Sequence, residues 1–75
     1  MKLGKYQHYK GNFYEVIGVA KHTETMEDFV VYKSLYESLE FPLGTLWIGP
    51  KEMFFGQAEL NGPKVPRFKF VGNVP

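Results

Sequence analysis

A strand with apolar residues on both faces is the feature that most constrains the fold. Residues 13–21, FYEVIGVAK, are rich in the aromatic and β-branched side chains that strands favour. Alternation along this segment gives one face of Tyr14, Val16 and Ala20 and a second face of Ile17 and Val19 beside Glu15. Gly18 lies in the middle, where glycine often marks a bulge or a bend. A bent strand that packs on both faces is typical of small barrels.

Turn signals divide the rest of the chain into short elements. We expect strands at residues 4–9, 28–36 and 46–48, a turn at 10–12, a reversal at 23–27 and a loop at 37–45. Proline suits the first position of a helix, so one helical turn is expected from Pro50 to Phe54, with Met53 and Phe54 pointing inward.

The last segment carries a hairpin signal. Asn61-Gly62 predicts a tight turn, and Pro63 and Pro66 make its second arm an edge strand, because proline donates no ladder hydrogen bond. Taken together, residues 1–75 predict a single, mainly β domain. The expected architecture is a small antiparallel SH3-like barrel of five or six short strands with one short helical turn.

Composition limits the function classes. The 75 residues include no cysteine, so packing must stabilise the domain, and 17% of the residues are aromatic. A net charge of +1 disfavours a generic nucleic-acid binder. No apolar run reaches the ~20 residues that span a bilayer, and no apolar segment follows Met1-Lys2-Leu3 as in a secretory signal. We therefore expect a cytoplasmic protein without membrane contact.

Three segments of the chain look familiar: GKYQHYKGNFYEVIGVAKHTETMEDFVVYKSLY, LWIGPKEMF and VPRF. Together they resemble a family of small bacterial proteins known as domain of unknown function 1653, over roughly residues 3 to 70. The family pattern has an arginine where this chain has Gly49. The resemblance implies a bacterial, cytoplasmic domain that can stand alone, and it implies no activity.

A polar loop follows the long strand. It carries His22, Thr23, Glu24 and Thr25, which are either ligand-binding groups or a turn in which the threonines bond local backbone. The match to the family pattern includes His22, Glu24 and Thr25, and this favours a site. His8, Tyr32 and Arg67 complete the ligand-binding candidates.

Catalytic and metal motifs are absent from the sequence. The spacing of His8, His22, Glu24 and Glu27 matches no standard zinc motif, and no serine lies in a nucleophile elbow. We assign no catalytic residue, metal or cofactor. Arg67, the one arginine, is either an anion clamp or the partner of an internal salt bridge to Glu24 or Glu15.

Most of the aromatic residues must form the core for so small a domain to fold. The aromatic residues expected at the surface are Tyr6, Tyr9, Tyr36 and Trp47. Such residues hold peptides or methylated lysines in SH3-like and Tudor-like modules. Together with Lys2, Lys5, Lys10, Lys64 and Lys69 they could instead stack nucleic-acid bases.

Three functions are therefore open. The preferred one is a non-catalytic binding module for a small ligand or a short peptide near His22, Glu24, Tyr32 and Arg67. The alternatives are a weak nucleic-acid binder that uses surface tyrosines and lysines, and a small enzyme acting on nucleotide-like metabolites with His22 and Glu24 as its acid–base pair. A protein partner also fits, in a monomer or a homodimer.

Overall fold

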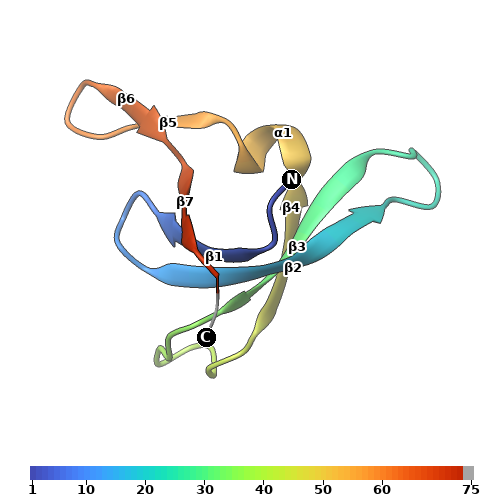
Figure 1. Ribbon diagram of the computed structural model, residues 1–75, viewed down its shortest axis with the longest axis horizontal. Coiled ribbons are helices and arrows are strands. Elements are labelled where there is room, and N and C mark those ends of the chain that lie inside the picture. The colour runs from blue at the N-terminus through green and yellow to red at the C-terminus, as the bar shows by residue number, and fades with distance from the viewer. Residues whose placement is uncertain (74–75) are drawn as a thin grey trace.

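The computed structural model, which describes residues 1–73, consists of antiparallel strands and one short helix (Figure 1). In chain order the elements are β1 (Gly4–His8), β2 (Phe13–Lys21), β3 (Asp28–Ser34), β4 (Leu46–Pro50), α1 (Lys51–Phe54), β5 (Gln57–Glu59), β6 (Lys64–Pro66) and β7 (Phe68–Gly72). The described chain has seven strands rather than the five or six expected, because its last segment is interrupted at Arg67.

The strands form two antiparallel sheets. One sheet has the order β4-β3-β2-β1-β7, and the other is the two-stranded ribbon β5-β6. The prediction of a mainly β antiparallel fold with one short helix is therefore confirmed. No pairing within residues 1–73 joins β4 to β7, so hydrogen bonds do not close the larger sheet into a barrel.

Two glycines mark irregular points of the larger sheet. The β2–β3 register shifts between Val16 and Gly18, which confirms the predicted bulge. Gly4, at the start of β1, has a φ of 132°, and a Cβ built there would lie 2.7 Å from the carbonyl oxygen of Gly72. Only glycine allows β1 and β7 to approach so closely at this point.

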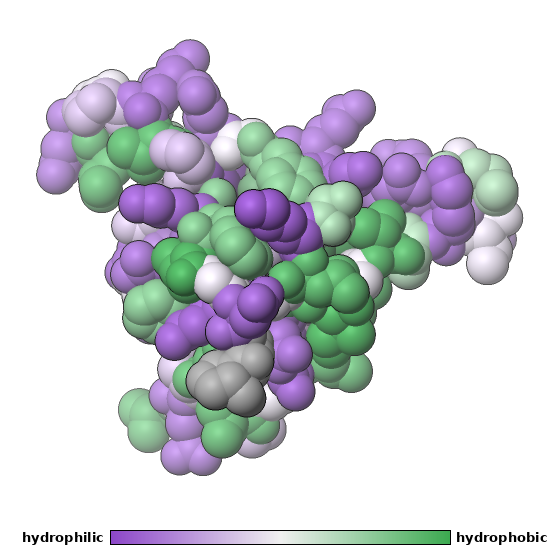
Figure 2. Space-filling model, viewed as in Figure 1, coloured by the Kyte–Doolittle hydropathy of each residue, from purple (hydrophilic) through white to green (hydrophobic). Residues whose placement is uncertain are grey.

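Two hairpins, β2–β3 and β5–β6, project from the body of the molecule (Figure 1). Asn61 and Gly62 have φ angles of 55° and 100°, as a tight hairpin turn requires, which confirms the predicted β5–β6 hairpin. Pro66 lies in that two-stranded ribbon, where both strands are edges. In Figure 2 hydrophilic residues dominate the projecting hairpins, whereas hydrophobic residues gather over the body.

The core lies between the larger sheet and α1. Its buried side chains are Tyr6, Val16, Val30, Phe54 and Phe68. Phe54 of α1 stacks on Phe68 of β7, with ring centroids 4.1 Å apart and planes 6° apart, and its edge meets Tyr6 at 5.4 Å. The predicted helical turn is present, but Pro50 precedes it as the N-cap, and Met53 is 57% exposed instead of pointing inward.

Within residues 1–73, no helix has the length and apolar character needed to cross a membrane.

Tyr6 corrects one prediction. It was expected at the surface, yet it is 4% exposed. The reason is its position in β1, which pairs with β2 on one side and β7 on the other, so neighbours cover its ring from both sides. The Tyr6 hydroxyl donates a 2.7 Å hydrogen bond to the carbonyl oxygen of Lys2, which satisfies the polar end of the buried ring.

An aromatic pocket with a half-buried arginine

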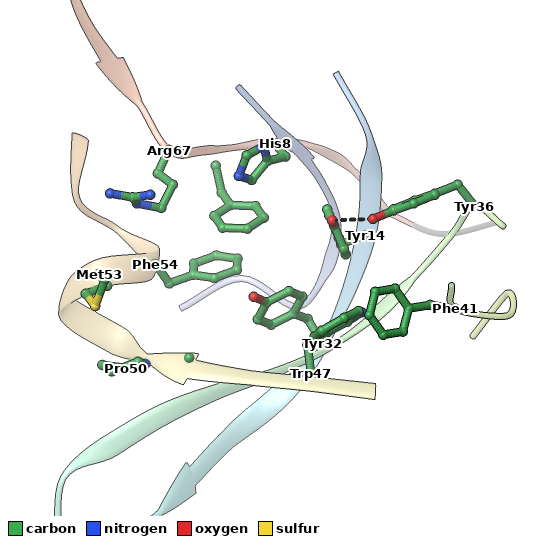
Figure 3. A pocket seen from close by; sticks show the side chains of 12 residues that line it. His8, Tyr14, Tyr32, Tyr36, Phe41, Trp47, Pro50, Met53, Phe54 and Arg67 are labelled. Carbon is green, nitrogen blue, oxygen red and sulfur yellow. Dashed lines mark hydrogen bonds between the residues drawn. The ribbon is translucent and has the colours of Figure 1, made fainter. Parts of the chain in front are cut away.

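A pocket of about 380 Å³ lies on the core side of the larger sheet, beside α1 (Figure 3). This volume is in the lower part of the ~300–1,000 Å³ range of ligand sites. Seven aromatic side chains dominate the lining, which consists of Tyr14, Tyr32, Tyr36, Phe41, Trp47, Phe54 and Phe68 together with His8, Gly49, Pro50, Met53 and Arg67. The pocket therefore combines flat apolar walls with one permanent cation.

Strand pairing brings the aromatic walls together. Tyr32 of β3 pairs with Trp47 of β4, and inward-facing positions on neighbouring strands point to the same side of the sheet. The Trp47 indole N–H donates a 2.8 Å hydrogen bond to the hydroxyl of Ser34, which is 2% exposed. Phe41 packs edge-to-face on Trp47 at 4.8 Å. These contacts fix the indole ring as one wall of the pocket.

Two tyrosine hydroxyls form a polar pair at another wall. The Tyr14 and Tyr36 oxygens are 2.8 Å apart and share a hydrogen bond (Figure 3). Burial, followed by this hydrogen bond, raises the pKa of Tyr14 well above its usual 10.0. Burial also raises the pKa of Tyr32, although Arg67 opposes that shift. Tyr14 and Tyr32 therefore remain neutral at physiological pH.

Arg67 is held in place by its main chain. Its N–H donates to the carbonyl oxygen of Gly56 at 3.0 Å, and its own carbonyl oxygen accepts from the Tyr9 N–H at 3.0 Å. The guanidinium Nε is buried and has no hydrogen-bond partner among the described residues. An unpartnered buried donor costs about 1–3 kcal/mol, more when it belongs to a charged group.

The salt-bridge interpretation of Arg67 does not hold for the described residues. The ion pairs within residues 1–73 are Lys21–Asp28, at 2.8 Å, and Lys33–Glu15, at 3.2 Å. Glu15 is therefore engaged by another residue, and neither pair includes Arg67. Arg67, which lines the pocket, is therefore without a carboxylate partner among the described residues.

His8 lies at the same end of the pocket as Arg67 (Figure 3). Burial lowers the pKa of His8 below its usual 6.5, and the positive charges of Lys10 and Arg67 lower it further. The Lys10 N–H donates to Nδ1 of His8 at 3.2 Å. The neutral ring therefore carries its proton on Nε2, which is a second donor.

The family model described as "Protein of unknown function (DUF1653)" matches residues 4–70. This chain belongs to the DUF1653 family. A crystal structure of a DUF1653 protein from Bordetella bronchiseptica is similar, with a TM-score of 0.85 and 32% sequence identity over 100% of this chain and 92% of that chain. No curated protein matches the sequence. The resemblance predicted from the sequence is thus confirmed.

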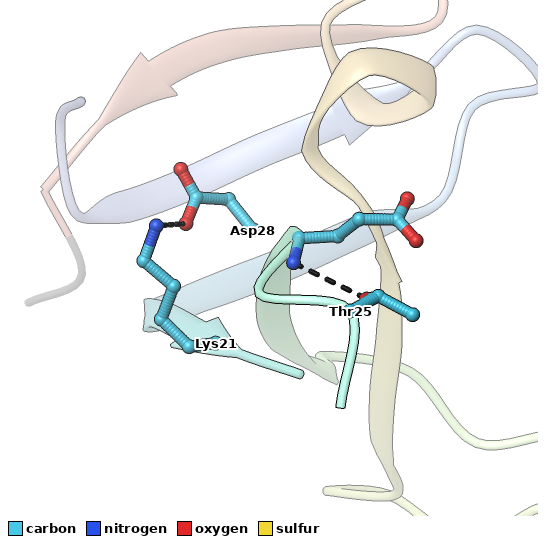
Figure 4. A network of polar contacts seen from close by, with 4 residues as sticks. Lys21, Thr25 and Asp28 are labelled. Carbon is cyan, nitrogen blue, oxygen red and sulfur yellow. Dashed lines mark hydrogen bonds and ion pairs between the residues drawn. The ribbon is translucent and has the colours of Figure 1, made fainter. Parts of the chain in front are cut away.

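The structure of this DUF1653 chain places His22, Thr23, Glu24 and Thr25 in the exposed turn between β2 and β3, away from the pocket. Nδ1 of His22 accepts from the backbone N–H groups of Glu24, at 3.2 Å, and Thr25, at 3.3 Å. The Thr25 hydroxyl accepts from the Glu27 N–H at 3.3 Å, next to the Lys21–Asp28 ion pair (Figure 4). The His22 and Thr25 side chains therefore stabilise the turn itself.

Other sequence candidates do meet in the pocket. His8, Tyr32 and Arg67 line it, and so do Tyr36 and Trp47, which were expected as surface aromatics. Tyr9 packs on His8 at 4.5 Å but is not part of the lining. Within residues 1–73 no three His, Asp or Glu side chains gather as a metal site requires.

Sequence reasoning missed several wall residues of this DUF1653 chain, namely Tyr14, Phe41, Gly49, Pro50, Met53, Phe54 and Phe68. For Tyr14, the alternation of side chains along the strand was a usable signal. Tyr14 and Tyr32 occupy inward positions of two strands expected to be neighbours, so their rings could have been grouped with Trp47 in advance. The contributions of α1 and of the loop that carries Phe41 depend on tertiary packing, which strand periodicity does not reveal.

Proposed function

We propose that this DUF1653 protein is a non-catalytic binding module whose aromatic pocket holds a small ligand or part of a short peptide. One observation carries the proposal: a pocket of about 380 Å³ with aromatic walls is also lined by Arg67, whose guanidinium makes no ion pair among the described residues. Ligand sites typically combine such apolar walls with a few convergent polar groups. The pocket around Tyr32 and Arg67 replaces the His22–Thr25 turn as the proposed centre of binding.

Binding is favoured over catalysis by the chemistry of the lining. General acid–base catalysis requires a proton-transfer group with a suitable pKa beside the reacting atoms. His22 and Glu24, the pair considered for an enzyme, lie in an exposed turn. Among the residues that line the pocket, His8 is the one side chain whose ordinary pKa lies near neutrality, and no carboxylate accompanies it there.

The nucleic-acid alternative has less support from the aromatic residues on which it depended. Tyr6 is in the core. The ammonium groups of Lys5 and Lys10 lie 4.4 Å and 5.8 Å from the ring centroids of Phe13 and Tyr9, where they compete with a stacking base. An oligonucleotide titration at several salt concentrations tests this alternative, because phosphate binding weakens steeply with salt.

We further propose that the larger sheet is an open relative of an SH3-like barrel. The bulged strand β2 and the short helix that precedes the last strands support this relationship.

An NMR titration of ¹⁵N-labelled protein with a library of small fragments tests the binding function. We expect shifts that concentrate at the backbone amides of the pocket and disappear in Gly49→Leu. A Cβ at Gly49 would lie 3.8 Å from the Tyr32 hydroxyl, which is ordinary contact, so a side chain can begin there. Because Gly49 lines the pocket, we expect the rest of a leucine to occupy the pocket. Ile48→Leu is the matched control, because Ile48 is 66% exposed on the same strand and outside the lining. Absence of shifts, or shifts that persist in Gly49→Leu, would contradict the proposal.

A further inference from the structure

We infer that the pocket selects a flat ring carrying an anionic group, carboxylate or phosphate, with the anion on Arg67 and the ring against Tyr32 and Trp47. This inference rests on the proposed binding function and specifies the chemical class of the ligand. Figure 3 shows the arrangement: Arg67 and His8 lie at one end of the pocket, and Tyr32, Trp47 and Phe41 lie at the other. The two ends thus present different chemistry to one molecule.

The charge of the ligand follows from the charges of the lining. Arg67 is permanently protonated, and no Asp or Glu is among the residues that line the pocket. A cationic ligand such as a methylated lysine would therefore meet a like charge without a countercharge. An anion would meet a guanidinium that makes no ion pair within residues 1–73. The planar fork of arginine matches carboxylate and phosphate oxygens.

His8 adds a second donor at the anionic end. Because its Nδ1 accepts from the Lys10 N–H, the neutral imidazole carries a proton on Nε2 and can donate from that atom. An anion held between Arg67 and His8 would receive hydrogen bonds from two segments that are distant in the sequence. Such convergence from β1 and from the residue before β7 fixes the position of one end of the ligand.

The shape of the ligand follows from the aromatic end. The indole N–H of Trp47 is engaged by Ser34 at 2.8 Å, so Trp47 offers its ring surface rather than a donor. Phe41 and Tyr32 meet neighbouring rings edge-to-face, so the walls at this end consist of aromatic ring faces and ring edges. Aromatic rings prefer offset or edge-to-face contacts with other rings at centroid distances of roughly 4.5–7 Å. A flat ring therefore uses these walls better than a branched aliphatic chain does.

Four matched probes test the charge and shape of the ligand. They share a benzene ring and differ in charge: 4-hydroxyphenylacetate carries a carboxylate, phenyl phosphate a phosphate, tyramine an ammonium group and 4-methylphenol no charge. Binding is followed by ¹⁵N NMR and by the fluorescence of Trp47, the only tryptophan of the chain. We expect one or both anionic probes to bind about tenfold or more tighter than 4-methylphenol, as one charge-assisted hydrogen bond implies, and tyramine to bind most weakly.

Failure of this inference is distinguishable from failure of the binding function. Equal or tighter binding of tyramine or 4-methylphenol in the pocket would overturn the inference and leave the binding function standing. If no probe and no library fragment shifts the pocket amides, both are overturned. Acetate and inorganic phosphate, tested alone, measure the anionic end separately; if they bind as tightly as the ring-bearing anions, the claim about the ring is wrong.

Variants assign the anion to Arg67. We expect Arg67→Gln to lose about tenfold or more in affinity for the anionic probe that binds and to leave 4-methylphenol unaffected. Arg67→Lys keeps the charge but lacks the planar fork, so it should fall between Arg67→Gln and the unmodified protein. Lys69→Gln removes an exposed charge from β7 outside the lining and is the matched control. Equal losses in Arg67→Gln and Lys69→Gln would overturn the assignment.

Folding of the variants is checked by their amide spectra. If Arg67→Gln does not fold, Gly49→Leu provides an independent test from β4, and retention of anionic-probe binding in that variant would overturn the inference.

A last comparison distinguishes two kinds of ligand that carry both an aromatic ring and a carboxylate. A free aromatic acid and a peptide that ends in an aromatic residue both present a ring and a carboxylate. Acetyl-Gly-Tyr with a free carboxylate is compared with its C-terminal amide and with 4-hydroxyphenylacetate. Preference for acetyl-Gly-Tyr over both supports a peptide C-terminus as the ligand, and preference for 4-hydroxyphenylacetate supports a free acid. Equal binding of acetyl-Gly-Tyr and its amide, at a level matching 4-hydroxyphenylacetate, would overturn the role of the anion.

Discussion

Ser34→Ala removes the hydrogen-bond acceptor that fixes one wall of the pocket. Ser34 is 2% exposed, and its hydroxyl accepts the Trp47 indole N–H at 2.8 Å. Without the hydroxyl, a part-buried N–H loses its partner, which costs about 1–3 kcal/mol. With a loss in the lower half of this range, ~1.5 kcal/mol, the melting temperature should fall by about 6–12 °C for a domain of this size.

A double-mutant cycle with Trp47→Phe tests this reasoning more sharply than the single variant. In the Trp47→Phe protein the Ser34 hydroxyl is buried and has lost its partner, so Ser34→Ala should there be neutral or stabilising. We therefore expect Ser34→Ala to lower the free energy of unfolding in the unmodified protein and to leave it unchanged or raise it in Trp47→Phe. Urea unfolding followed by far-UV circular dichroism measures both, because Trp47 fluorescence is absent from half of the cycle. Equal losses in both backgrounds, within about 0.5 kcal/mol, would refute the argument.

The remaining predictions concern the core, a strained glycine and a histidine. Phe54→Ala should cost about 3–5 kcal/mol, because it removes the ring stacked in the core, and thermal melting should show a loss comparable with the whole stability of so small a domain; a loss below ~1 kcal/mol would contradict the packing. Gly4→Ala should lose more than ~1 kcal/mol in urea unfolding, since its Cβ would meet Gly72, whereas Gly18→Ala, with open space around it, should be nearly neutral. Burial and two nearby cations hold the pKa of His8 below 6.5, so the unfolded chain takes up more protons as the pH falls through 6.5 and the free energy of unfolding decreases toward acid pH; an NMR-measured pKa of His8 at or above 6.5 would contradict this.

Sequence patterns spanning a few residues were sufficient to predict much of the fold. Residues 13–21 form the predicted strand with its bulge at Gly18, and Asn61-Gly62 forms the predicted turn. These features depend on backbone preferences that act over a few residues, and sequence patterns report such preferences directly. The burial of Tyr6 depends instead on strand order, because only the pairing of β1 with β7 covers its second side.

The candidate site was less accessible to sequence reasoning. The His22–Thr25 segment attracted attention because polar residues cluster there, but hydrogen bonds within the turn engage His22 and Thr25. His8, Tyr32 and Arg67 were named as ligand-binding candidates, yet nothing in their spacing indicated that they meet. Their proximity results from the pairing of distant strands and from the placement of α1, which are properties of the complete fold.

The pairing of β1 with β7 also has a consequence for biosynthesis. His8 pairs with Phe68, so two positions 60 apart in the sequence are neighbours in the same sheet and line the same pocket. During translation β1 leaves the ribosome early and waits with one edge unpaired until β7 emerges. Contacts so distant in sequence slow folding and prolong the exposure of apolar strands. The pocket therefore forms last, once β7 has paired with β1 and the folding of this sheet is complete.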